Sequence, residues 1–166
     1  NVTITGTYGD GVDADDLGNV LINGGTLDIT VDTITGKGIN CDSTYTQTDG
    51  TVTLTMPSTM LSAKGIDIGG NGFLSGGSII ATVTANGSKG IKGDGNFTMS
   101  GGTMTMNCSG GKDKVTDPND AAKCYGVKLD GIWSKTGGTC SISISSTVAA
   151  CIKDASNTYG SDGTIN

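Results

Sequence analysis

The residues in this sequence best suited to chemistry are carboxylates that gather near the N-terminus and recur behind it. Six of them occupy related places in the first three repeats described below: Asp10, Asp13, Asp15, Asp16, Asp42 and Asp67. Carboxylates this close together repel one another unless a cation lies between them, and a hard, oxygen-rich site suits Ca²⁺. The sequence therefore predicts a calcium site here, with a solvated polar corner as the alternative. Asp94 and Asp130 continue one of these rows as further candidate ligands.

Lysines form a second repeated series beside the acids. They fall in two rows, one of Lys37, Lys64 and Lys89 and one of Lys92, Lys128 and Lys153. Uronate-cleaving lyases use calcium together with a lysine general base. The metal acidifies the proton beside the substrate carboxylate, and the lysine removes that proton. Because no arginine is present to steady the substrate, we favour binding without catalysis. Lys92 and Lys128 would then belong to a basic stripe that holds an anionic polymer such as pectin, and charge balance is the alternative.

The aromatic residues are few (Phe 2, Trp 1, Tyr 4), yet Tyr125 and Trp133 both fall in one repeat. Flat rings beside an ordered loop are a common platform for stacking sugar faces. Trp133 also aligns with Phe97, which has inward parity. A packed indole is therefore as good an interpretation as a sugar platform.

The composition excludes several classes of function. The chain has no histidine, its sixteen acids are all Asp and its ten bases are all Lys. This removes the histidine general base, the Ser-His-Asp triad and the paired-Glu glycosidase. The formal net charge of −6 argues against nucleic acid and anionic membrane surfaces as partners. The longest apolar run near the end, 148–152, is too short to cross a bilayer.

Internal repeats dominate the chain. Five segments of seven residues superimpose: 9–15 (GDGVDAD), 36–42 (GKGINCD), 63–69 (AKGIDIG), 88–94 (SKGIKGD) and 124–130 (CYGVKLD). A second marker, Gly-Gly or Asp-Gly, has its second residue at 25, 50, 77, 102, 138 and 163, so successive copies lie 25, 27, 25, 36 and 25 residues apart. One coil is thus about 25 residues long, and the long interval holds an insertion at about 110–120.

Within each coil apolar and polar residues alternate with a period of two, which indicates strands with one buried face. Strand direction is the same in every copy, so neighbouring coils are expected to pair in parallel. The sequence predicts an all-β, right-handed parallel β-helix of about six coils that forms a single domain over 1–166. The outward positions are rich in Thr. Such rows could match the lattice of a crystalline polysaccharide or of ice, but most simply reflect β-propensity.

The stretch 90–106 (GIKGDGNFTMSGGTMTM) resembles the bacterial β-helical carbohydrate-binding domains that are similar to polysaccharide lyases. The resemblance covers nearly all of 9–165, although part of its motif is common to β-solenoids. It implies an extracellular or cell-surface location, calcium at Asp-rich corners and adhesion to plant polysaccharides such as cellulose or pectin. The sequence departs from the pattern where Lys92, Lys128 and Lys153 replace acids or Asn, and in the degenerate coil at 41–49.

The five cysteines give two further expectations. Cys41, Cys108 and Cys140 have inward parity and are expected in the core. Cys108 and Cys124 bracket the insertion, so a disulfide between them is one alternative. Cys151 takes a corner position that holds Gly in most other coils, where it is expected to be reactive.

The two ends of the chain suggest an alternative function. Counting repeats in both directions places Asn1 and Asn166 at the coil position of Asp28. Such a chain is either cut from a longer solenoid or completed by another copy of itself, which would give a head-to-tail filament. The leading hypothesis is an extracellular, calcium-binding β-helix that adheres to polysaccharide. The filament subunit is second and the lyase third.

Overall fold

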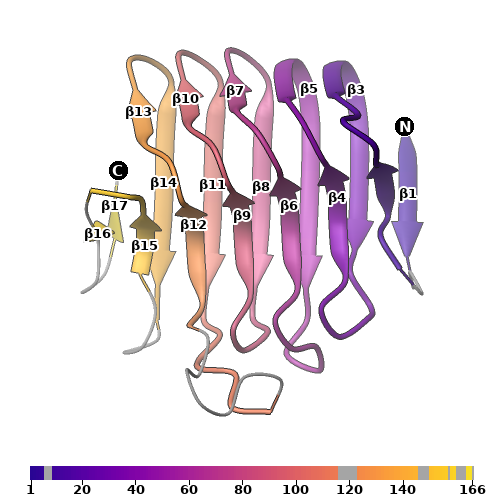
Figure 1. Ribbon diagram of the computed structural model, residues 1–166, viewed down its shortest axis with the longest axis vertical. Coiled ribbons are helices and arrows are strands. Elements are labelled where there is room, and N and C mark those ends of the chain that lie inside the picture. The colour runs from indigo at the N-terminus through magenta and orange to yellow at the C-terminus, as the bar shows by residue number, and fades with distance from the viewer. Residues whose placement is uncertain (6–8, 116–122, 146–149, 157, 160–163, 166) are drawn as a thin grey trace.

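The computed structural model describes residues 1–5, 9–115, 123–145, 150–156, 158–159 and 164–165. These residues form an all-β parallel solenoid of about five turns, and they contain no helix. Figure 1 shows the coils stacked side by side from β1 at one end to β16 and β17 at the other. No helix that could cross a membrane occurs in the described part of the chain.

Three strand faces make up each turn. The main sheet contains β1 (Val2–Thr5), β3 (Val20–Thr30), β5 (Tyr45–Met56), β8 (Ser78–Val83), β11 (Thr103–Cys108), β14 (Thr139–Ile144) and β17 (Thr164–Ile165). The second sheet contains β2 (Val12–Ala14), β4 (Lys37–Cys41), β6 (Lys64–Ile68), β9 (Lys89–Gly93), β12 (Tyr125–Leu129), β15 (Ala150–Lys153) and β16 (Thr158–Tyr159). The short-strand face is built from β7 (Gly72–Leu74), β10 (Phe97–Met99) and β13 (Trp133–Lys135), which continue the first halves of β3 and β5.

The predicted alternation is confirmed strand by strand. Along the second half of β5, Val52, Leu54 and Met56 are fully buried while the Thr residues between them point outward. The same register repeats in β8 and β11, so each apolar residue stacks on its equivalent in the next coil. The core is therefore one continuous column of apolar, mostly aliphatic side chains that runs along the solenoid.

The repeated glycines serve two different purposes. Gly25, Gly50, Gly77, Gly102 and Gly138, the second residues of the turn marker, have positive φ, as expected of sharp corners. The glycines inside the seven-residue motif do not. A Cβ on Gly38 would lie 2.6 Å from the carbonyl oxygen of Gly65 in the next coil. This set instead lets the backbones of neighbouring coils approach one another closely.

Gly38→Ala tests this close approach. The added methyl group would also lie 3.0 Å from Leu54 Cδ2, so neither neighbour can give way without disturbing the core. Overpacking of this kind costs roughly 1–3 kcal/mol, so we expect the Tm to fall by roughly 2–12 °C. Gly9→Ala is the matched control, because no atom lies within 4 Å of its added Cβ. Equal melting temperatures for the two variants, measured by circular dichroism, would contradict the close-approach explanation.

The C-terminal end departs from the predicted repeat. The spacing of the turn marker predicted that the residues around 163 continue the parallel stack. Instead β16 runs antiparallel to β15, and β17 runs antiparallel to β14. At this end Cys151 occupies the place that Gly126 and its predecessors hold in the stack. Asn166 lies outside the described residues.

Cys151 is also not an exposed corner. It is buried within β15, and its Sγ donates a hydrogen bond to the carbonyl oxygen of Ile142 at 3.1 Å. The expectation of a reactive thiol at this position is therefore wrong, because the thiol faces the core.

Candidate functional site

A hollow of about 260 Å³ opens on the outer face of the main sheet, where β8, β11 and β14 end. Its lining comes from three consecutive coils: Thr82, Thr84, Asn107, Cys108, Ser109, Ser143, Ile144 and Ser145. Most of these residues carry a hydroxyl or amide group. The site therefore combines hydroxyl and amide groups with apolar surface on the outside of the solenoid, and we call it the hydroxyl groove.

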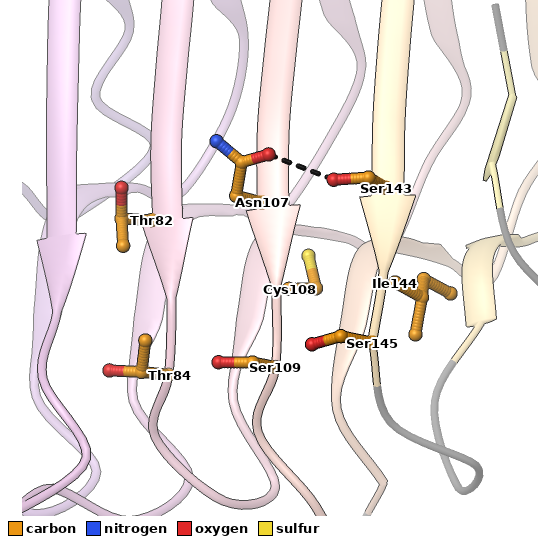
Figure 2. A pocket seen from close by; sticks show the side chains of 8 residues that line it. All are labelled: Thr82, Thr84, Asn107, Cys108, Ser109, Ser143, Ile144 and Ser145. Carbon is orange, nitrogen blue, oxygen red and sulfur yellow. Dashed lines mark hydrogen bonds between the residues drawn. The ribbon is translucent and has the colours of Figure 1, made fainter.

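The polar side chains of the hydroxyl groove form two rows across the strands (Figure 2). The first row follows from strand register, since Asn107 pairs with Thr82 on one side and Ser143 on the other. Neighbours in such a row are about 4.8 Å apart, the spacing of paired strands. The row thus presents one hydrogen-bonding side chain per coil at a regular interval.

The second row lies two residues further along, just beyond the strand ends. Its members, Thr84, Ser109 and Ser145, stay aligned because their backbone N–H groups donate to the preceding coil. Ser109 N donates to Val83 O and Ser145 N to Cys108 O, both at 2.9 Å. The two rows are separated by about 6.6 Å along the chain, as expected for a two-residue step in an extended strand.

Hydrogen bonds within the groove orient its groups. Ser143 Oγ donates to Asn107 Oδ1 at 2.8 Å, so the amide nitrogen of Asn107 remains directed to solvent. Thr84 Oγ1 donates to Met56 O at 3.0 Å. The lining can donate and accept hydrogen bonds in a fixed pattern, and none of its side chains is charged.

An apolar surface adjoins the groove. Ile80 lies two residues before Thr82 on the outer face of β8 and is 39% exposed. It stands between Thr53 and Thr105 of the neighbouring coils. Sugars present both hydroxyl groups and apolar C–H faces, and binding sites for small polar ligands combine apolar lining with a few placed polar groups.

The predicted acidic cluster is only partly brought together. Asn40 Nδ2 donates to Asp13 Oδ1 at 2.8 Å and to Asp15 Oδ1 at 3.0 Å, so the two carboxylates lie on one amide. The pKa of Asp15 is raised, chiefly by the negative charge of Asp13, with smaller contributions from Asp42 and Asp16. Asp16 N also donates to Asp42 Oδ2 at 3.2 Å. Four of the predicted carboxylates therefore share one corner.

Asp10 and Asp67 have different partners. Lys37 Nζ lies 3.6 Å from a carboxylate oxygen of each, and Lys64 Nζ lies 2.6 Å from Asp67. These two acids therefore neutralise lysines of the first predicted row. In the described part of the chain, no group of three or more carboxylates or thiols has the geometry to hold a metal ion.

Lys92 likewise forms ion pairs with two of the predicted acids, so its ammonium group is not free to bind a glycan. Its Nζ donates to Asp94 and, at 3.1 Å, to Asp130. Burial lowers the pKa of Lys92, but these hydrogen bonds and charges outweigh it and the net shift is upward. Asp94 and Asp130 thus hold an ammonium group already. Charge balance, the alternative interpretation of the lysine ladder, applies at this position.

Lys128 lies on a more positive part of the second sheet. It pairs in register with Lys92 and Lys153. Burial lowers the pKa of Lys89, and the positive charges of Lys128 and Lys64 lower it further. Tyr125 is in register with Lys89. A basic surface therefore does exist on the face that carries these residues.

Trp133 is packed rather than presented. Its ring stacks on Phe97 with centroids 5.5 Å apart and planes inclined by 16°. The half-buried indole contacts the core. Of the two interpretations of Trp133, packing is the one that this contact supports.

Sequence reasoning missed the residues of the second groove row, because Thr84, Ser109 and Ser145 follow the strands and fall outside the alternation. It also missed Phe73, the aromatic residue of the short-strand face that points outward and is 41% exposed. A signal existed for Phe73, since it aligns with Thr46 and Thr98, both at outward positions.

The fold and the groove define a β-solenoid with a polar outer surface suited to hydrogen bonding. Residues 1–114 match the model of a family described as carbohydrate-binding domain-containing protein. The chain belongs to this family, since the match spans more than half of its length. Searches of the curated proteins and of the solved structures found no match. Of the groove, Thr82 to Ser109 lie within the matched residues and Ser143 to Ser145 lie beyond them.

Proposed function

We propose that this protein binds polysaccharide without catalysis, and that the hydroxyl groove is its contact surface. The observation that carries the proposal is the pair of aligned polar rows, which present a hydroxyl or amide from each of three coils in one hollow. Family membership supports a carbohydrate as the ligand.

A polymer suits this groove better than a single small sugar. The rows run across the strands, so a glycan chain lying along them would meet an equivalent set of donors and acceptors at each coil. Hydrogen bonds to uncharged groups contribute roughly 0.5–1.5 kcal/mol each, so useful affinity requires several in series. Ile80 offers an apolar contact for the face of a sugar ring beside the same rows.

The neutral lining points to uncharged glycans. With no charged side chain in the groove, binding should change little between low and high salt. The basic surface around Lys89, Lys128 and Lys153 is a second candidate surface, which would select acidic glycans such as pectin. Binding through these lysines should instead fall steeply as salt screens their charge.

Retention on insoluble glycans tests the proposal. The purified chain is mixed with a panel of neutral and acidic polysaccharides at low and high salt, and the unbound protein is measured. Salt-independent retention on a neutral glycan is the expected result. If the protein is retained only on acidic glycans and high salt abolishes this retention, the lysine surface rather than the groove is the binding surface. Absence of retention on every glycan would overturn polysaccharide binding.

We further propose that the acidic corner binds calcium. Asp13 and Asp15, which share the amide of Asn40, would hold the ion together with water molecules as further oxygen ligands. The raised pKa of Asp15 supports the fit because it reflects repulsion that a cation would relieve. In the folded chain Asp15 holds its proton more tightly than in the unfolded chain. Its ionised form therefore destabilises the fold at neutral pH, and this penalty disappears as the pH falls through its pKa.

Calcium is accordingly expected to raise the Tm at neutral pH. At concentrations about tenfold to a hundredfold above the Kd, binding stabilises by roughly 1.4–2.7 kcal/mol, or roughly 3–11 °C. Asp15→Asn should reduce this rise, and Asp28→Asn, an acid on the main sheet, should not. The measurement is thermal unfolding with calcium and then with a chelator. An equal rise in both variants, or none in the parent chain, would rule out this corner.

Two further features complete the proposal. We propose that the coils wind in the right-handed sense, the sense of nearly all parallel β crossovers. We also propose that the protein acts outside the cell, where polysaccharides and millimolar calcium are both available to it.

A further inference from the structure

Two cysteines stand at the points where the insertion leaves and rejoins the solenoid. Cys108 is the last residue of β11, and Cys124 immediately precedes β12. The intervening residues, 109–123, carry the whole insertion. Both thiols are almost completely buried, at 2% and 0% exposure.

The two thiols lie close together. The strands that they flank, β11 and β12, are in contact, and each thiol is the first influence on the pKa of the other. Gly110 packs against the second of these thiols, since a Cβ there would lie 3.2 Å from Cys124 Sγ. The fold therefore brings together two sulfurs that are distant in sequence and holds them at one place under the insertion.

The first half of the insertion is already fixed to the solenoid. Gly111 N donates to Asn86 Oδ1 at 2.7 Å, and Ser62 Oγ donates to Asp113 Oδ2 at 2.7 Å. Asp113 is fully buried. Because these contacts position the start of the insertion without help from Cys124, a covalent bond at Cys124 would fix its far end as well.

We propose that Cys108 and Cys124 form a disulfide in an oxidising environment and that this bond staples the insertion to the solenoid. The oxidant is a small-molecule disulfide. The thiolate of one cysteine attacks one of its sulfurs and releases one thiolate; the second cysteine then loses its proton, attacks the sulfur of the first and displaces the second thiolate. The two cysteines lose two electrons and two protons in total, and the small-molecule disulfide becomes two thiols.

The folded environment affects the two thiols differently. The pKa of Cys124 is lowered, first by the hydrogen bond from Cys108 and then, against the effect of burial, by the Gly110 N–H and the charge of Lys89. The pKa of Cys108 is raised by the same hydrogen bond and by burial. These shifts belong to the reduced, folded pair. Because both thiols are buried in the finished fold, the exchange itself takes place before folding is complete.

Of the other thiols, Cys151 lies near enough to Cys108 and Cys140 to raise the pKa of each, but the Cys108–Cys124 pair is the one whose members are the first influence on each other. Cys151 Sγ donates to Ile142 O, and Cys41 Sγ donates to Gly18 O in an early coil. Cys140 is buried within β14. The geometry therefore selects one of the pairings that five cysteines allow.

Peptide mapping tests the bond directly. The protein is refolded with reduced and oxidised glutathione, denatured without reductant, alkylated and digested. A cross-linked peptide joining Cys108 to Cys124 is expected, and it should persist in Cys41→Ser and vanish in Cys108→Ser. Alkylation of both residues in the parent chain, or a cross-link from either of them to Cys140 or Cys151, would overturn the proposal. The unmutated protein alone gives this result, so it does not depend on whether a variant folds.

Thermal unfolding provides the second readout. Closing a loop of about 15 residues should raise the Tm of the oxidised parent chain by roughly 6–12 °C over the reduced one. Reductant should leave the Tm of Cys108→Ser unchanged. An identical Tm for oxidised and reduced parent chains would show that the bond does not staple the insertion. The outcome is independent of glycan binding.

Discussion

Replacing Thr82, Asn107 and Ser143 together by alanine is expected to weaken polysaccharide binding by roughly tenfold to a thousandfold. The three residues form the first row of the hydroxyl groove, one from each coil. If each makes one hydrogen bond to the glycan, their loss removes roughly 1.5–4.5 kcal/mol. Their side chains point away from the core, so the fold should remain. Affinity is measured by depletion on insoluble glycan and stability by thermal unfolding.

A triple variant on the same sheet provides the matched control. Thr51, Thr103 and Thr139 also point outward, from the opposite end of the strands. Alanine at these positions removes the same number of polar side chains outside the hollow. Equal loss of binding in both triple variants would mean that the threonine array as a whole, rather than the groove, contacts the glycan.

Phe97→Ala is expected to cause the largest loss of stability. Phe97 is fully buried, stacks on Trp133 and lies against Gly72 in the preceding coil. Truncating a buried phenylalanine costs roughly 3–5 kcal/mol through lost burial and the cavity left behind. For a chain of this size the Tm should fall by roughly 6–20 °C.

Phe73→Ala is the natural comparison because Phe73 occupies the adjacent coil of the same face but points outward. Its loss should change the Tm by no more than about 2 °C, since exposed substitutions usually stay within about 0.5 kcal/mol. Should Phe73→Ala melt as early as Phe97→Ala, the assignment of the inward and outward sides of this face would be wrong.

The alternation of apolar and polar residues predicted the strands well, because it depends only on which side of each strand is buried. Val52, Leu54 and Met56 had to share one side, and parallel pairing then followed from the common direction of the repeats. The repeat did not reveal why its glycines recur. Positive φ at Gly77 and close coil contact at Gly38 call for the same residue for different physical reasons.

Only one of the two rows of the candidate site could be predicted from the sequence. Thr82, Asn107 and Ser143 were placed outward by the alternation, which gave one row of the groove. The second row lies beyond the strand ends, where the alternation ceases, and its position depends on backbone hydrogen bonds between coils. For Lys92 the sequence predicted the row of lysines to which it belongs. It did not predict that the Lys92 ammonium group bonds to Asp94 and Asp130, because those contacts depend on the side-chain conformation.

The most direct test of the account is to map glycan contacts residue by residue in solution. Amide and side-chain NMR shifts are recorded while a soluble oligosaccharide of the retained glycan is added. The largest changes are expected on the side-chain amide of Asn107 and on the other groove residues, Thr82, Ser109, Ser143 and Ser145. Saturable changes confined to Tyr125, Lys128 and their neighbours on the second sheet would contradict it.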